Sequence, residues 1–150
     1  ECTCPPGTVH RYLGRISGPL MDRIDLHIEV TPVSIPEITS GARGESSAAI
    51  RERVVRAREV QRKRFQGVEG VHTNAMMTSR MVREYCPIDA AARTLLERAM
   101  ERLSLSARAY DRILKVARTI ADLAAEERIG TAQIAEAIAC RSLDRESWGR

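Results

Sequence analysis

From Ser46 to about residue 145, apolar residues recur every three or four positions with few interruptions, and this spacing favours helices over strands. Composition supports the same class, because 43% of the residues are apolar but only 3% are aromatic. The strands of a β-sandwich would use more aromatic and β-branched side chains. We therefore expect a mainly α fold, in which a small helical bundle packs around Leu, Ile, Val, Ala and Met.

Each expected helix begins at a residue suited to a helix N-terminus. In chain order, the expected starts are Ser46 or Ser47, Ser79, Asp89, Ser106 and Gly130. The first helix should bury a stripe and stop at Gly67; the stripe comprises Ile50, Val54, Ala57 and Phe65. The helix from Ser106 to about Glu126 is expected to be the longest.

Residues 1–45 differ in composition and hold five of the six prolines. Within them, Leu26, Ile28 and Val30 alternate with polar residues, which predicts a strand. A lone strand is not stable in water, because its backbone and its apolar face need a sheet. We therefore expect residues 1–45 to be a fragment of an α/β core, mobile without its partner strands, residues 46–145 to be a helical domain, and residues 146–150 to be a tail.

Composition also restricts the class of protein. No run of about 18 apolar residues predicts a membrane span and no charged-then-apolar leader opens the chain, so a cytoplasmic protein is expected. The first residue is not methionine, which suggests a piece of a longer protein. The net charge of +4, from 24 basic and 20 acidic residues, is compatible with nucleic-acid binding but does not indicate it by itself.

Three blocks of the sequence resemble the magnesium-chelatase-like AAA+ ATPases. Cys2-Thr-Cys4 and the run from Tyr12 to Val30 are similar to the end of that family's ATPase core. The runs Ala57–Phe65 and Leu105–Leu123 are similar to its C-terminal helical domain, so the resemblance covers about residues 1–145. It implies the helical lid of an ATP-driven homo-oligomeric ring, a hexamer, that uses ATP and Mg²⁺.

The Cys-x-Cys pair and the segment Ile16–Pro19 resemble the competence-helicase branch, which remodels DNA, more than the magnesium chelatase subunit. The chain has no Gly-x-x-x-x-Gly-Lys-Ser/Thr loop for phosphate, so we expect an ATP hydrolase in the parent protein but no activity in these 150 residues alone. Met21 stands where the family usually has leucine, a volume-conserving change.

Arg23 lies in the segment Leu20-Met21-Asp22-Arg23, which matches the family's arginine-finger segment. The resemblance implies that Arg23 reaches the γ-phosphate bound by a neighbouring subunit, where a planar guanidinium stabilises the charge of the transition state. The alternative is a structural ion pair between Arg23 and Asp22 or Asp25.

Arg108 lies in the first turn of its helix, where the unpaired N–H groups carry partial positive charge and a cation is unfavourable. Arg112 lies one turn further on the same face, so an anion is expected opposite the pair. A nucleotide phosphate would be such an anion. The resemblance implies that Arg108 is the sensor 2 arginine, acting across the subunit boundary, whereas the alternative is an ion pair with Asp111.

The first helix of the bundle is strongly basic. Glu52 with Arg56, and Glu59 with Lys63, have the spacing of surface ion pairs. Left over on one flank of this helix, without acidic neighbours by this pairing, are Arg51, Arg58 and Arg62. They form either a contact for DNA phosphates or a neighbouring subunit, or simply a solvated face.

The four cysteines match neither a disulfide framework nor a complete zinc finger, which favours a reducing compartment. In competence-type members a similar pair precedes this one, so Cys2 and Cys4 could be half of a tetrahedral zinc site. Cys86 and Cys140 are expected to be buried and inert. A rival hypothesis for the whole chain is a helical interaction or nucleic-acid-binding module with no catalytic role.

Overall fold

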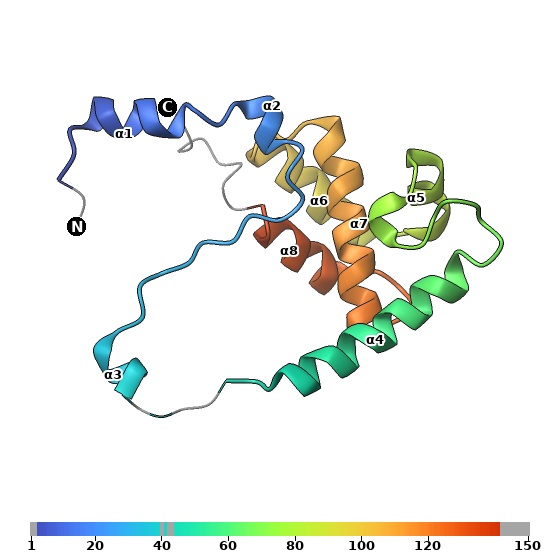
Figure 1. The fold of residues 1–150 in the computed structure, drawn as a ribbon. Helices are drawn as coiled ribbons and strands as arrows, with labels where there is room; N and C mark the ends of the chain where they lie inside the picture. The colour runs from blue at the N-terminus through green and yellow to red at the C-terminus, as the bar shows by residue number, and fades with distance from the viewer. Residues whose placement is uncertain (1–2, 40, 42–43, 142–150) are drawn as a thin grey trace.

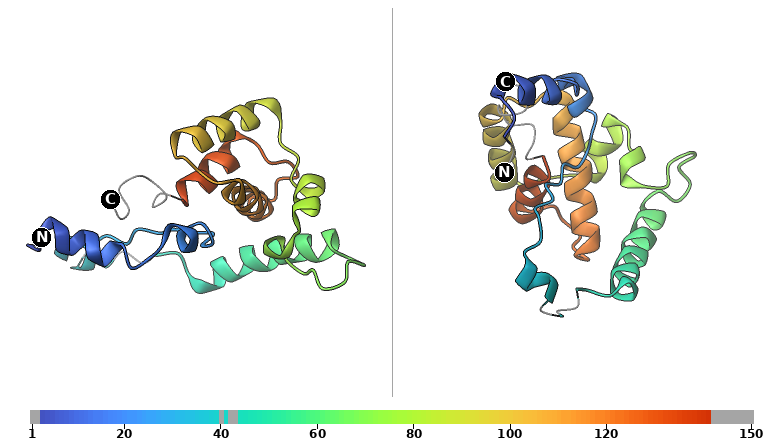
Figure 2. Two further views of the ribbon diagram at one scale, coloured as in Figure 1. Left: turned by 90° about the horizontal axis from the view of Figure 1, so that it is seen from above. Right: turned by 60° about the vertical axis from the view of Figure 1, so that its left-hand side comes forward.

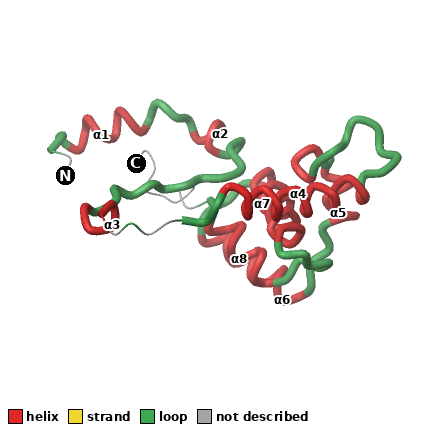
Figure 3. The backbone as a smooth tube through the Cα atoms, turned by 60° about the horizontal axis from the view of Figure 1, so that its bottom comes forward, coloured by secondary structure: helices red, strands yellow, loops and turns green. Residues whose placement is uncertain are grey.

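The computed structural model describes residues 3–39, 41 and 44–141, and this part of the chain is helical without a named strand (Figure 3). The helices are α1 (Pro6–Leu13), α2 (Gly18–Met21), α3 (Ile35–Thr39), α4 (Ser47–Arg64), the short 3₁₀ helix η1 (Asn74–Met76), α5 (Ser79–Tyr85), α6 (Ala90–Arg102), α7 (Ala107–Leu123) and α8 (Thr131–Ala139). The mainly α expectation is confirmed. The tail at 146–150 lies outside the described residues.

Side-chain caps set the helix starts, as the sequence predicted. The Oγ of Ser46 accepts a hydrogen bond from the N–H of Ala49 at 3.3 Å, and the carboxylate of Asp89 accepts one from Ala92 at 2.7 Å. Ser106 caps α7 in the same way. Each cap satisfies a backbone donor that has no partner within its helix. α7 is nevertheless not the longest helix, because it has 17 residues and α4 has 18.

The hydrophobic core surrounds α7, which lies at the centre of the bundle (Figure 1). Its apolar face is formed by fully buried residues at helical spacing, among them Ile113, Ala117 and Ala121. α8 packs on this face through Ile134 and Ala137, and α6 completes the core through Ala92 and Leu96. The small alanines let these helices approach closely, which explains how a core almost free of aromatic residues is filled.

Helix α4 meets the bundle only through its C-terminal half. Ala57 and Phe65 are buried, whereas Ile50 and Val54 are each 42% exposed. The predicted apolar stripe is therefore wrong for its first two members, since no described element covers the N-terminal half of the helix. Gly67 lies in the turn after α4 with φ of 81°, where a residue without Cβ is favoured.

The segment before α4 runs outside the bundle (Figures 1 and 2). Helix α2 lies beside the N-terminal end of α7, and an extended stretch then leads away to α3. The predicted strand at Asp25–Val30 is wrong, because none of the described residues pairs with this stretch as a β-strand. The alternating pattern gives it an apolar face, but Ile28 and Val30 are 75% and 87% exposed.

Candidate functional site

The candidate site lies at the N-terminal end of α7, where Arg108 occupies the second helical position. No acidic residue lies in this first turn. Arg108 is exposed and, within the described part of the chain, has neither a hydrogen bond nor an ion pair from its side chain. The alternative partner, Asp111, instead accepts a hydrogen bond from the hydroxyl of Ser79 at 2.5 Å. The guanidinium of Arg108 therefore stays free in the positive field of the helix N-terminus.

Arg112, one turn along α7, has an anionic partner. Its guanidinium forms an ion pair with the carboxylate of Asp25, 87 residues earlier in the chain. At Arg112 the expected anion is thus a side chain of the protein, which relieves the repulsion between the two arginines. Only the unfavourable field of the helix N-terminus remains, and it acts on Arg108.

Arg23 lies just after α2 and is exposed. Its side chain makes no ion pair with Asp22 or Asp25 among the described residues, and Asp25 contacts Arg112 instead. The structural alternative for Arg23 therefore does not hold here. The neighbouring Met21 is buried, which anchors the end of α2 while Arg23 points to solvent.

The chain that follows Arg23 is fastened to α7 and to the end of α8. The backbone carbonyl of Ile24 accepts a hydrogen bond from Nη1 of Arg141 at 2.8 Å. The N–H of His27 donates to the carbonyl of Cys140 at 2.6 Å, and the His27 side chain is buried. With the ion pair to Asp25, these contacts place the segment of Arg23 beside the N-terminal end of α7 (Figure 2).

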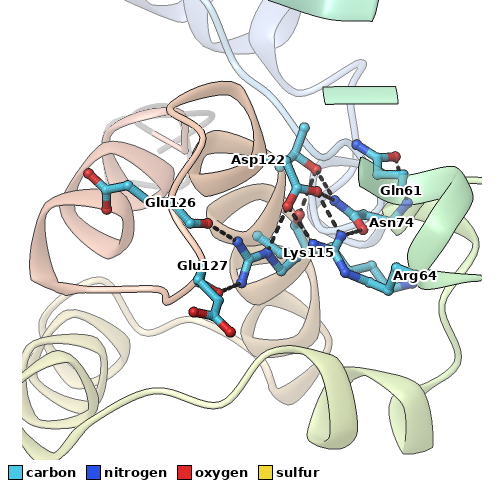
Figure 4. Close-up of polar contacts among 9 residues, drawn as sticks. Gln61, Arg64, Asn74, Lys115, Asp122, Glu126 and Glu127 are labelled. Atoms are coloured by element: carbon cyan, nitrogen blue, oxygen red, sulfur yellow. Dashed lines mark hydrogen bonds and ion pairs between the residues drawn. The ribbon is translucent and has the colours of Figure 1, made fainter. Parts of the chain in front are cut away.

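A buried polar cluster joins other parts of the bundle (Figure 4). The carboxylate of Asp122 accepts hydrogen bonds from Arg64 at 2.5 and 2.7 Å, from Asn74 at 2.8 Å and from Arg118 at 3.1 Å. The guanidinium of Arg118 also donates to the backbone carbonyls of Glu126 and Glu127. This cluster was not expected from the sequence, although an Arg and an Asp four residues apart on the apolar face of a helix are a usable signal.

The basic face of α4 is only partly as predicted. Glu52 and Arg56 form the expected ion pair at 2.6 Å. Glu59, however, pairs with Arg62 at 2.8 Å and not with Lys63, so Arg62 does have an acidic neighbour. Arg51 and Arg58 remain exposed, and no ion pair to either is found among the described residues.

The cysteines do not support a zinc site. Cys4 is exposed, Cys2 lies outside the described residues, and no cluster of three or more metal-binding side chains occurs in the described part. Cys86 is buried as expected, and its burial raises the thiol pKa to about 11, so it stays protonated at neutral pH. Cys140 is only partly buried, contrary to expectation, and partial burial raises its pKa as well.

No helix in the described residues is long and apolar enough to cross a membrane.

Comparisons with known proteins show the family of this chain. The family described as magnesium chelatase, subunit ChlI C-terminal, matches residues 44–141, and the family described as magnesium chelatase, subunit ChlI, matches residues 1–38. Competence protein ComM of Haemophilus influenzae is 42% identical over 141 residues, which cover 93% of this chain and 27% of ComM. The YifB protein of Escherichia coli K12 is 41% identical over 144 residues, covering 95% of this chain and 27% of YifB.

The chain thus spans only about a quarter of the length of these relatives. Within that quarter, the family match covers the whole helical bundle, and the identity extends through the segment that carries Arg23. The chain therefore belongs to the magnesium-chelatase-like AAA+ family that includes ComM and YifB.

Proposed function

We propose that these residues form the nucleotide-sensing lid portion of an ATP-driven AAA+ ring, in which Arg23 is the arginine finger and Arg108 is sensor 2. The observation that carries the proposal is the first turn of α7. There an exposed arginine lies where helix N–H groups already disfavour a cation, and no described acidic side chain neutralises it. A nucleotide phosphate is an anion that would make this arrangement favourable.

The two arginines have complementary roles in this proposal. Arg23, exposed at the end of α2, reaches the γ-phosphate of a nucleotide held by a neighbouring subunit. Its permanently charged, planar guanidinium stabilises the charge that spreads over the γ-oxygens during transfer to water. Arg108 contacts the same nucleotide from the lid. The phosphate-binding loop and the acid that holds Mg²⁺ belong to other parts of the parent protein.

The test uses the full-length parent protein with Arg23→Ala or Arg108→Ala. We expect ATP turnover to fall roughly 10³-fold for Arg23→Ala and somewhat less for Arg108→Ala. The free energy of unfolding should change by no more than about 0.5 kcal/mol, because neither exposed side chain belongs to the core. Arg98→Ala, on the exposed face of α6, is the matched control and should leave turnover unchanged.

Mixed rings test whether the arginines act across a subunit boundary. A phosphate-loop variant that cannot bind ATP, but keeps both arginines, should partly rescue an arginine variant when the two assemble together. Some interfaces would then join an intact loop to an intact arginine. Mixed rings with no more activity than the separate variants would refute action across the boundary.

Failure of the Arg108→Ala protein to fold would show that Arg108 has a structural role and would contradict its assignment as sensor 2.

The competence-type relative favours DNA as the substrate of a hexameric ring in the cytoplasm. Arg51 and Arg58 on the exposed face of α4 are the residues that we assign to DNA phosphates or to a neighbouring subunit. Arg62 contributes less, because Glu59 already neutralises it. A magnesium chelatase subunit is the alternative within the family, and a stimulation of ATP turnover by DNA would distinguish the two.

A further inference from the structure

We propose that Arg112 is a positioning residue, which holds the arginine-finger segment against α7 through its ion pair with Asp25. The proposal rests on the assignment of Arg23 as the finger. Arg112 itself does not touch the nucleotide. Its role is to keep Arg23 and Arg108 in a constant position relative to each other. A single movement of the helical domain then brings both guanidinium groups to the nucleotide.

Arg108 and Arg112 lie on consecutive turns of α7. Arg108 and Arg112 are four residues apart, which is about one helical turn or 6 Å along the axis. Arg108 is exposed without a described partner, whereas Arg112 is paired with Asp25. The same stretch of helix therefore presents one arginine to a ligand and uses the next to hold the chain two residues after Arg23.

Apart from the ion pair, this segment is held near the C-terminal end of α8 and by the buried side chain of His27, while its other apolar side chains are exposed. The stretch from Asp25 to Val30 has no described partner strand, and Leu26 and Ile28 are 50% and 75% exposed. The guanidinium of Arg141, just after α8, donates a hydrogen bond to the backbone carbonyl of Ile24, and the N–H of His27 donates to the carbonyl of Cys140. The ion pair between Asp25 and Arg112 links this segment directly to α7.

The ion pair between Arg112 and Asp25 should contribute little to the free energy of folding, and its main effect should be to position the segment of Arg23. The side chains of Arg112 and Asp25 are 30% and 45% exposed, so solvent screens their attraction. Loss of the pair should leave the bundle folded, because its core lies on the opposite, apolar face of α7. A loose finger segment on a stable lid would lower the rate of phosphoryl transfer without weakening ATP binding to the same degree.

The activity test uses the full-length parent protein. Arg112→Gln and Asp25→Asn remove the same ion pair from opposite sides, and each should lower kcat by about tenfold while KM for ATP changes less than twofold. The double variant Arg112→Asp with Asp25→Arg restores the pair in reverse and should recover at least half of the lost kcat. Arg98→Gln is the control for loss of a surface arginine.

A second readout is independent of activity and uses the 150-residue chain. The N–H of His27 is bonded to Cys140, so its hydrogen exchange reports whether the segment is attached. Exchange at His27 should become at least fivefold faster in both single variants and return towards the original rate in the reversed pair. The N–H of Ala117, in the core of α7, should exchange at an unchanged rate.

The outcomes separate this inference from the proposed function. If Arg23→Ala abolishes turnover but both single variants keep full kcat, the positioning role is wrong and the finger assignment stands. If Arg23→Ala itself keeps its turnover, the proposed function fails, whatever happens at His27. A loss of kcat that the reversed pair does not restore would also overturn the inference, because it would point to the individual side chains.

Discussion

Asp122 connects three elements of the bundle through its carboxylate. It lies on α7, and its side chain is fully buried between the guanidinium groups of Arg64 on α4 and Arg118 one turn back. Asn74 of η1 donates to the same carboxylate, and its own N–H is bonded to Gln61. Because buried Arg118 and partly buried Arg64 both depend on this anion, the cluster is stable only when it is complete.

Replacement of Asp122 with alanine should therefore destabilise the chain by about 3–5 kcal/mol, since it leaves Arg64 and Arg118 desolvated without an anion. Urea unfolding followed by circular dichroism measures the change. Glu97→Ala, an exposed acid on α6 without a described ion pair, is the control and should cost less than about 0.5 kcal/mol. A loss below 1 kcal/mol at Asp122 would mean that the cluster is hydrated and not a tight buried network.

Two helices of the bundle end with a left-handed residue that is not glycine. Ala125 after α7 has φ of 58°, and Ser104 after α6 has φ of 50°. At each end the next N–H bonds back across the turn, Glu126 to Ala121 at 2.8 Å and Leu105 to Met100 at 2.9 Å. These are the hydrogen bonds of a Schellman motif, which usually places glycine at the left-handed position.

Glycine at either position should stabilise the chain, because it removes the steric cost of a Cβ in the left-handed region. We expect Ala125→Gly and Ser104→Gly each to raise the free energy of unfolding by about 0.5–1 kcal/mol, after the greater entropy of the unfolded glycine is counted. Ala135→Gly, in the middle of α8, is the matched control and should cost about 1 kcal/mol. Equal destabilisation in all three variants would show that the two helix ends are not strained.

At the scale of the whole molecule, we propose that the bundle and the segment of Arg23 act as the lid of a larger ATPase. No glycine in the 150 residues is followed by lysine, so the chain contains no loop of the Gly-x-x-x-x-Gly-Lys-Ser/Thr type. The residues that we assign to the nucleotide, Arg23 and Arg108, would contact it through their side chains only. Tight binding needs the backbone N–H groups of a phosphate loop as well.

The 150-residue chain alone should neither hydrolyse ATP nor bind it tightly. Isothermal titration with ATP and Mg²⁺ should give no binding in the micromolar range, and a phosphate-release assay should give no turnover. The parent protein with its phosphate loop is the positive control. Micromolar binding together with turnover would contradict the assignment of these residues to a lid.

The helical bundle could be predicted from the sequence, because the signals for its helices are local. Capping by Ser46, Asp89 and Ser106 depends on a backbone N–H three residues away, and helical periodicity depends on neighbours within one or two turns. These features specified where the helices begin. They also placed Arg108 in a first turn, where its charge is unfavourable.

The side-chain pairs between distant parts of the chain depend on the tertiary structure. Asp25 pairs with Arg112, 87 residues away in the sequence, and Asp122 pairs with Arg64, 58 residues away. No local spacing predicts either ion pair. The alternation at Asp25–Val30 specifies an apolar face but supplies no partner strand, so the expected strand is an exposed, irregular segment. Burial follows the same rule: Ile50 and Ala57 share a pattern, yet only Ala57 has a helix packed against it.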